Sequence, residues 1–246
     1  MVAAGVLLSL RLMTARARRD GFPDPEQAAD MVFVAVFWGF AGARFFYVLE
    51  NPAWYAENPL RIFAFWEGGL IFYGGMALAL VALLCFLRLK GIGMVRGLDF
   101  ILPYVALSHA FGRVGCFLNG CCYGSACEFA WCVRQGELEG TFHPAQLYEA
   151  LFNVLLFVFL NALYGRKRFH GQVAGLYFMF YALGRFVLEF WRGANPYWGL
   201  LTHNQWISVF VALSAGLFYG LKAREIAGGR APSGDNRPLA GGKDHG

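Results

Sequence analysis

Long apolar segments, separated by short polar connections, make up most of this chain. A helix of about 20 mainly apolar residues is long enough to cross the hydrocarbon of a bilayer. Windows of this kind recur six times, and each predicts a transmembrane helix: residues 31–49, 68–89, 98–119, 145–164, 172–191 and 204–221. The amino-terminal segment Met1–Met13 is apolar but too short to cross. We interpret it as the tail of a first helix whose beginning is missing, which gives about seven transmembrane helices.

The composition agrees with a membrane fold. Of the 246 residues, 58% are hydrophobic and only 15% are charged, which is unlike a water-soluble domain. The sequence therefore predicts an all-α, polytopic helical bundle, with one integral-membrane domain over residues 1–227. Residues 228–246 mix Gly, Pro and charged side chains and cannot build a core. We expect them to form a disordered cytoplasmic tail.

The basic residues of the short connections predict the orientation, because cytoplasmic loops are enriched in Lys and Arg. They cluster after every second segment: Arg16, Arg18 and Arg19; Arg88, Lys90 and Arg96; Arg166, Lys167 and Arg168; Lys222 and Arg224. This alternation places the amino terminus outside and the carboxyl terminus in the cytoplasm. It also explains the net charge of +5 without a nucleic-acid partner.

Three arginines lie inside the apolar segments: Arg44, Arg113 and Arg185. A guanidinium at the centre of a spanning helix costs roughly 2.5–3.5 kcal/mol, so each needs a partner or a function. A lipid phosphate is a natural partner inside a membrane, because a guanidinium can hold it through two parallel hydrogen bonds.

The helix predicted over residues 172–191 carries its polar residues on one face. Tyr181, Arg185, Glu189 and Arg192 follow one another at helical spacing. One interpretation is an ion pair between Arg185 and Glu189 that only makes the charges tolerable. The other is that Glu189 holds Arg185 while its remaining donors face a substrate oxyanion, with the Tyr181 hydroxyl in the same site.

Other polar groups gather at the predicted outer ends of the helices. Arg113 and Asn119 accompany closely spaced glycines, which predicts either helix packing or, as we favour, a polar pocket. Tyr73 is either an interfacial anchor or a site residue. His143 is equally well explained as an interfacial cap or as a base, whereas His109 and His203 are interpreted as structural.

Five cysteines cluster near the outward face: Cys116, Cys121, Cys122, Cys127 and Cys132. Their spacing lacks the Cys-x-x-Cys pairs of most zinc and redox sites. Disulfides are favoured, for instance one that involves Cys127 and Cys132, since an oxidising outer compartment promotes them. Free structural thiols and a metal or redox site are the alternatives. Cys85, in mid-span, is interpreted as an inert small hydrophobe.

Five motifs follow one another between about Gly39 and Leu221: GARFFYVL (42–49), EGGLIFYGG (67–75), GRVGCFLNG (112–120) followed by Gly124, HPAQLYEA (143–150) and YALGRFVLEFWR (181–192). Together they carry a resemblance to the prolipoprotein diacylglyceryl transferase family of the bacterial inner membrane. It implies a multi-pass enzyme that moves the diacylglyceryl group from phosphatidylglycerol to the lipobox cysteine thiol of a preprolipoprotein signal peptide. Membrane lipids would be its other partners. The implied reaction requires no metal and no soluble cofactor.

The resemblance also implies site residues. Arg113 and Arg185 would bind the headgroup and the leaving phosphate, Glu189 would position Arg185, and Tyr73 would complete the catalytic set. Substrate contacts are expected from the residues that line the pocket: Arg44, Glu67, Gly74, Gly75, Gly115, Cys116, Asn119, Gly124, His143 and Tyr181.

Three positions depart from the family pattern. Tyr73 stands where the family usually has a histidine, Cys116 where it has an asparagine, and Cys121–Cys122 where a glutamate often precedes the closing glycine. A phenol is a weak general base at neutral pH, so Tyr73 acts as a hydrogen-bond donor or the base is another group, such as Glu67 or His143. Cys116 could also be a nucleophile.

Two other functions are compatible with the sequence. The cysteines at 116–132 could serve a membrane thiol–disulfide oxidoreductase, although their spacing argues against it. A non-catalytic relative that binds phospholipid or signal peptides is the second alternative.

Overall fold

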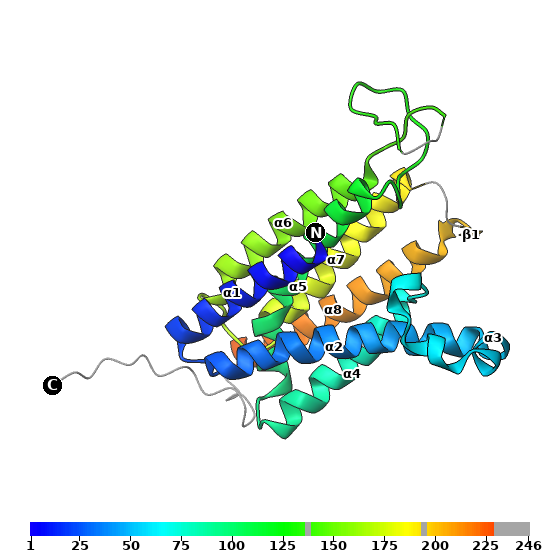
Figure 1. Ribbon diagram of the computed structural model, residues 1–246. Helices are drawn as coiled ribbons and strands as arrows, with labels where there is room; N and C mark the ends of the chain where they lie inside the picture. The colour runs from blue at the N-terminus through cyan, green and yellow to red at the C-terminus, as the bar shows by residue number, and fades with distance from the viewer. Residues whose placement is uncertain (136–138, 193–195, 229–246) are drawn as a thin grey trace. The chain divides into compact units, whose positions relative to one another are not determined.

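The computed structural model describes residues 1–135, 139–192 and 196–228, with the side chain of Glu67 outside the description. Within these ranges most of the chain is helical (Figure 1). Six helices are long and apolar enough to cross a membrane: α2 (Pro25–Glu50), α4 (Phe72–Leu89), α5 (Met94–Leu118), α6 (Ala145–Tyr164), α7 with its 3-10 extension η3 (Gln172–Trp191) and α8 (His203–Ala227). They coincide with the six predicted segments, and the all-α polytopic fold is confirmed.

The remaining elements are short or more polar. The amino-terminal segment forms α1 (Val2–Asp20), which extends beyond the predicted Met1–Met13 and is not among the six apolar helices of the described chain. The connection from α2 to α4 contains α3 (Pro52–Glu57), η1 (Pro59–Phe63) and η2 (Phe65–Glu67). Strands β1 (Tyr197–Trp198) and β2 (Leu201–Thr202) form a small antiparallel hairpin before α8. The predicted tail at 228–246 lies outside the described residues apart from Gly228.

The chain groups into two compact units, which we describe separately. The α2–α4 unit comprises residues 10–97, and the α5–α8 unit comprises residues 1–9 together with the chain from Leu98 onward. The predicted single domain over 1–227 stays a prediction.

Glycines let the two helices of the α2–α4 unit pack closely. A Cβ on Gly42 would lie 2.8 Å from the carbonyl oxygen of Gly74, and one on Gly75 would lie 2.6 Å from that of Gly39. A Cβ on Gly74 would strike the Phe46 side chain. Larger residues would therefore separate the helices, so Gly74 and Gly75 serve close backbone approach in this unit.

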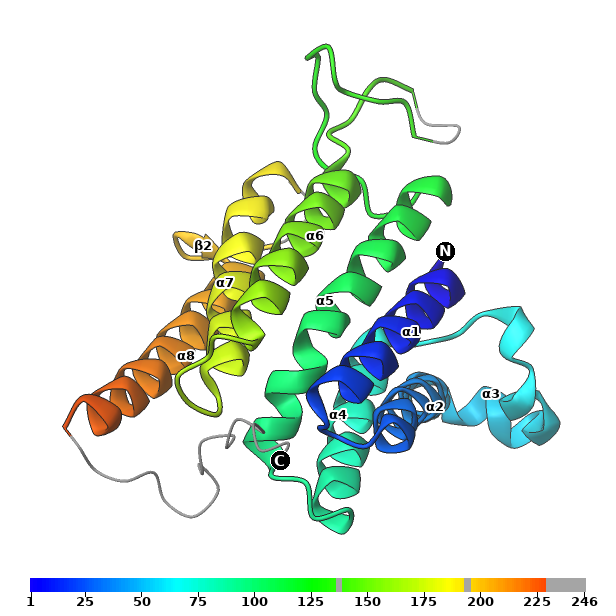
Figure 2. The ribbon, with the colours of Figure 1, turned by 90° about the vertical axis from the view of Figure 1, so that its left-hand side faces the viewer.

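In the α5–α8 unit, α6 and α7 lie side by side, and α5 contacts both (Figures 1 and 2). Ring contacts between Phe100 and Tyr164 and between Tyr104 and Phe157 join α5 to α6. The outer surfaces of the helices in each unit remain apolar. Phe210 and Leu213 of α8, for example, are 72% and 69% exposed. Such surfaces suit contact with lipid tails.

A buried carboxylate fixes the start of α7. Asp99 of α5 is fully buried, and its two oxygens accept hydrogen bonds from the backbone N–H groups of Gly171 and Ala174, each at 2.8 Å. The ammonium of Lys167 lies 3.0 Å away. Asp99 therefore caps α7 from a neighbouring helix, where the amino-terminal N–H groups have no intrahelical partner.

We expect Asp99→Ala to lower the free energy of unfolding by about 3–5 kcal/mol, because it leaves a buried ammonium and two amide donors without their acceptor. The measurement is denaturant unfolding of the purified protein in detergent. Asp20→Ala is the matched control. Asp20 pairs with Arg16 and Arg19 at the surface, so its loss should cost at most about 1 kcal/mol. Equal losses in the two variants would contradict the assigned role of Asp99.

Candidate active site

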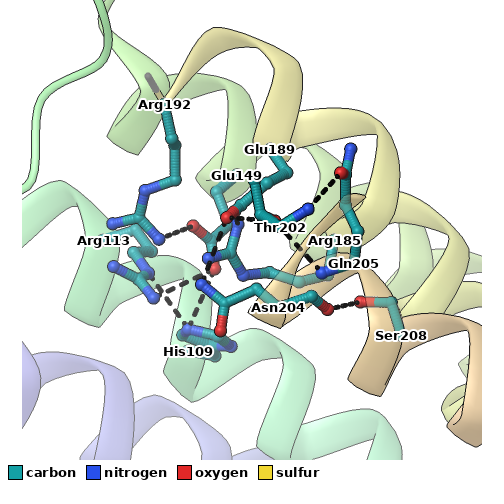
Figure 3. Close-up of polar contacts among 10 residues, drawn as sticks. All are labelled: His109, Arg113, Glu149, Arg185, Glu189, Arg192, Thr202, Asn204, Gln205 and Ser208. Carbon is teal, nitrogen blue, oxygen red and sulfur yellow. Dashed lines mark hydrogen bonds and ion pairs between the residues drawn. The ribbon is translucent and has the colours of Figure 1, made fainter. Parts of the chain in front are cut away.

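Glu149 of α6 is the centre of a polar cluster inside the α5–α8 unit (Figure 3). Its carboxylate is buried, at 2% exposure, and the guanidinium of Arg113 lies 3.1 Å from its Oε1. Arg192 lies at 4.0 Å from Oε2. Arg113 also donates through Nε to Nε2 of His109, one turn earlier on α5, and that ring nitrogen is 3.5 Å from Glu149. One carboxylate thus faces two guanidinium groups, and Arg113 connects it to the imidazole of His109.

Glu189, at the end of α7, is the second carboxylate of the cluster. Its Oε2 forms an ion pair of 2.7 Å with Arg185, one turn before it. Its Oε1 accepts hydrogen bonds from the Thr202 hydroxyl at 3.0 Å and from the Asn204 amide at 3.2 Å (Figure 3). With these three partners Glu189 has little freedom to move, and Arg185 is held in turn.

Local sequence explains how Thr202 reaches Glu189. The β1–β2 hairpin turns at Gly199, whose φ of +71° suits glycine, and it ends at Thr202, the N-cap of α8. Thr202 and Gln205 form a reciprocal capping box, in which the Thr202 hydroxyl accepts from the Gln205 N–H. The same hydroxyl donates to Glu189, so one side chain begins a helix and positions a carboxylate.

Positive charge is in excess in this cluster. Arg113, Arg185 and Arg192 face two carboxylates, Glu149 and Glu189, so one guanidinium charge is not balanced within the group. The three arginine side chains keep 17%, 16% and 17% exposure, whereas the carboxylates are almost completely buried. The cluster can therefore accept an anion such as a phosphodiester on the side where the guanidinium groups remain open.

The structure brings most of the predicted stripe of α7 to this site. The Arg185–Glu189 contact is confirmed, Arg192 reaches Glu149, and the ring of Tyr181 lies 5.6 Å from that of His109. The ion pair predicted by the first interpretation of this stripe is therefore present. The oxyanion role of the second stays a prediction.

Sequence reasoning missed several members of the cluster. It gave no role to Glu149, although the residue lies in the HPAQLYEA segment, and it treated His109 as structural without a partner. His109 does have a partner, because Arg113 lies four residues later on α5 and donates to its ring, whereas its structural role stays a prediction. The i, i+4 spacing could have revealed this pair. No sequence pattern indicated Thr202 and Asn204, because they reach Glu189 only through the hairpin that precedes α8.

Arg44 is used differently, within the α2–α4 unit. It is 3% exposed, and its guanidinium donates to carbonyl oxygens in the connection to α4. Its acceptors are the carbonyls of Arg61, Ile62, Ala64, Gly68 and Gly69. All five N–H groups thus have acceptors in the polypeptide, so in this structure Arg44 organises the loop. A substrate contact by Arg44 stays a prediction.

The long connection between α5 and α6 is anchored near its ends. Gly124 donates to the carbonyl of His143 at 2.8 Å, and a Cβ on Gly124 would clash with the backbone carbonyl oxygen of Trp191, so only glycine fits. His143 is buried, and its Nδ1 lies 3.3 Å from the Tyr148 hydroxyl. Cys127 and Cys132 form a disulfide, which confirms the pairing given as an example from sequence. Gly124 and His143 therefore shape this loop.

Comparison with known proteins decides the family. A family model described as prolipoprotein diacylglyceryl transferase matches residues 1–220. The chain belongs to this family. Relatives named phosphatidylglycerol–prolipoprotein diacylglyceryl transferase include one from Bordetella parapertussis, 36% identical over 204 residues, which cover 79% of this chain and 78% of the relative. The relative from Streptococcus agalactiae is 32% identical over 220 residues, which cover 86% and 85%.

The remaining predicted site residues of this transferase family member are placed as follows. Gly115 and Cys116 lie in the last turn of α5, and Asn119 is exposed in the turn that follows, so Asn119 and Arg113 do not share a helix face. Tyr73 begins α4 in the other unit and is 67% exposed. Glu67 ends η2, and its side chain is outside the described part of the structure.

Thr202→Ala should lower the free energy of unfolding by about 1–2 kcal/mol, because it removes both the N-cap of α8 and a hydrogen bond to a buried carboxylate. Thr202→Ser keeps the hydroxyl and should stay within about 0.5 kcal/mol of the wild type. The measurement is denaturant unfolding in detergent, followed by circular dichroism. If serine destabilises as much as alanine, the methyl group rather than the hydroxyl is what matters at this position.

Proposed function

We propose that this chain transfers the diacylglyceryl group of phosphatidylglycerol to the lipobox cysteine thiol of a prolipoprotein, with glycerol phosphate leaving. Membership of a transferase family and the presence of six apolar helices support this assignment. The observation that carries it is the half-buried arginine cluster with its excess positive charge. The alternative of a thiol–disulfide oxidoreductase is not favoured, since the matching family model and the relatives described above are all named as transferases.

The reaction creates negative charge on phosphate. When the thiolate sulfur attacks the glyceryl carbon, the carbon–oxygen bond to the phosphodiester breaks and the departing phosphate gains a second charge. Guanidinium groups that are already held in place stabilise this charge without reorganisation during the reaction. In this proposal Arg113 and Arg185 contact the phosphate, and Arg192 adds to the field.

The carboxylates act through the arginines. Glu149 holds Arg113 and Glu189 holds Arg185, so both are positioning residues. Tyr181, beside His109, offers a hydroxyl at the edge of the same cluster. In this proposal Gly115 and Gly124 shape the protein near the cluster, and Asn119 lies in the exposed turn after α5. Tyr73, Glu67 and His143 remain the candidate groups for proton chemistry outside the cluster.

The proposed location is the bacterial cytoplasmic membrane, with the amino terminus outside and the carboxyl terminus in the cytoplasm. The distribution of basic residues supports this orientation. The preprolipoprotein signal peptide and phosphatidylglycerol would then both reach the enzyme from within the bilayer. The outward ends of α5 and α6 would receive the lipobox cysteine.

Arg113→Ala and Arg185→Ala should each reduce transfer roughly 100-fold or more, because each removes preorganised stabilisation of the leaving phosphate. The assay follows radiolabelled phosphatidylglycerol into a lipobox peptide. Arg166→Ala, an exposed residue of the α6–α7 connection, is the control and should keep full activity.

Two results would overturn the proposal. Full activity in both variants would remove the arginine cluster from the reaction. Binding of the lipid without any product from the unaltered chain would identify a non-catalytic relative. Arg113→Lys tests the geometry, because an ammonium keeps the charge but cannot form the bidentate contact, and it should recover only part of the activity.

A further inference from the structure

Three free thiols meet at the end of α5. The sulfur atoms of Cys116, Cys121 and Cys122 lie within 4.8 Å of one another, and none of the three cysteines is in a disulfide. Cys116 and Cys121 are partly buried, and Cys122 is exposed. The three thiols are thus already close together, and the cluster is open to solvent at Cys122.

The backbone folds back to gather these thiols. After α5, Gly120 adopts a φ of +68°, and the Cys121 N–H donates to the carbonyl of Cys116 at 3.1 Å. Cys122 has a φ of +63°, the only positive value at a non-glycine position in the described chain. This conformation is uncommon for a residue with a Cβ. It directs two consecutive cysteines toward the helix that they follow.

A buried glutamine connects the thiols to the arginine cluster. Gln146 of α6 is 1% exposed, and its amide donates to the carbonyl of Cys121 at 2.6 Å. Gln146 lies three residues before Glu149, on the same helix face, and Glu149 holds Arg113. On α5, Arg113 is in turn three residues before Cys116. Two neighbouring helices therefore place Cys116 and Gln146 one helical turn from Arg113 and Glu149, the two residues of this ion pair.

We propose that Cys116, Cys121 and Cys122 form a zinc site with three thiolate ligands and an open fourth position. Zinc favours thiolate ligands in tetrahedral geometry, and sites with three protein ligands leave one position for a reactant. The charge of Zn²⁺ offsets most of the negative charge of the three thiolates. The sequence had favoured disulfides here and predicted no metal, because the spacing lacks a Cys-x-x-Cys pair. The chain reversal with positive φ at Gly120 and Cys122 nevertheless brings the three sulfur atoms within 4.8 Å of one another.

The open position would take the lipobox thiol, an extension that rests on the proposed transferase function. A thiol that coordinates zinc loses its proton to solvent and becomes the nucleophilic thiolate. This sulfur forms the bond to the glyceryl carbon, and the carbon–oxygen bond breaks with its electron pair on the phosphate oxygen. The product thioether is neutral and binds zinc weakly, so it can leave. The site would supply the deprotonation for which Tyr73 is poorly suited.

The test measures zinc in the purified full-length protein. The protein is prepared without reductant, so that the Cys127–Cys132 disulfide persists, then equilibrated with Zn²⁺ and desalted. We expect about one zinc per chain by elemental analysis, and at least a tenfold loss in Cys116→Ser and Cys121→Ser. Cys85→Ser is the matched control, because Cys85 is a free cysteine of α4 in the other unit, and it should retain full zinc.

Three results would overturn the site. The first is a wild-type protein that contains no zinc, and the second is equal zinc content in the cluster variants and the control. The third is a disulfide between two of the three cysteines, detected by mass spectrometry. Cobalt substitution provides a second readout, since thiolate ligands give a charge-transfer absorption that Cys116→Ser should lose.

A transfer assay on zinc-free protein separates this inference from the proposed function. Chelation should abolish transfer while phosphatidylglycerol still binds, and added Zn²⁺ should restore it. Unchanged transfer by the zinc-free protein would overturn the role of zinc and leave the transferase standing. Bound zinc with no transfer under any condition would instead overturn the transferase and its extension, while the metal site itself would stand.

Discussion

The cost of placing charge in hydrocarbon is the constraint on which the α5–α8 unit depends. A guanidinium does not lose its proton under physiological conditions, so it can enter an apolar bundle only beside an acceptor. Glu149 and Glu189 provide these acceptors, and each would itself be costly to bury alone. Helix α6 supplies Glu149, and α5, α7 and α8 each contribute a charged or polar partner to one of the two carboxylates. The contacts that pack the helices of this unit are therefore also the contacts that pair its buried charges.

Arg44 shows that the same residue type can satisfy this constraint in another way. Its guanidinium is saturated by five backbone carbonyls, with no charged partner among these acceptors. The α5–α8 cluster instead shares two carboxylates among three arginines, which leaves charge and exposed donors. A saturated guanidinium stabilises a loop, whereas an incompletely paired one can bind an anion. Number and kind of acceptors, rather than depth in the membrane, distinguish the two uses.

The sequence was sufficient for the helices, because apolar windows of spanning length are a strong signal and each of the six became a helix. It was also sufficient for Arg185 and Glu189, whose spacing of four residues makes them neighbours on any helix. Contacts between helices were not accessible. Glu149 meets Arg113 only because α6 packs on α5, and Thr202 meets Glu189 only because a hairpin returns the chain to the end of α7. No spacing rule connects residues 13 or 36 positions apart in these ways.

One face of α6 sets the distance between the two chemistries inferred for this unit. Gln146 fixes the turn that carries the thiols, and Glu149 fixes Arg113. Residues three apart on an α-helix differ by about 4.5 Å along its axis. A sulfur that attacks a glyceryl carbon, and the phosphorus whose oxygen leaves that carbon, are also separated by only a few bond lengths. The buried face of α6 can therefore keep the nucleophilic sulfur and the leaving phosphate at a fixed separation. The reaction requires this, because nucleophile and leaving group must be held in line.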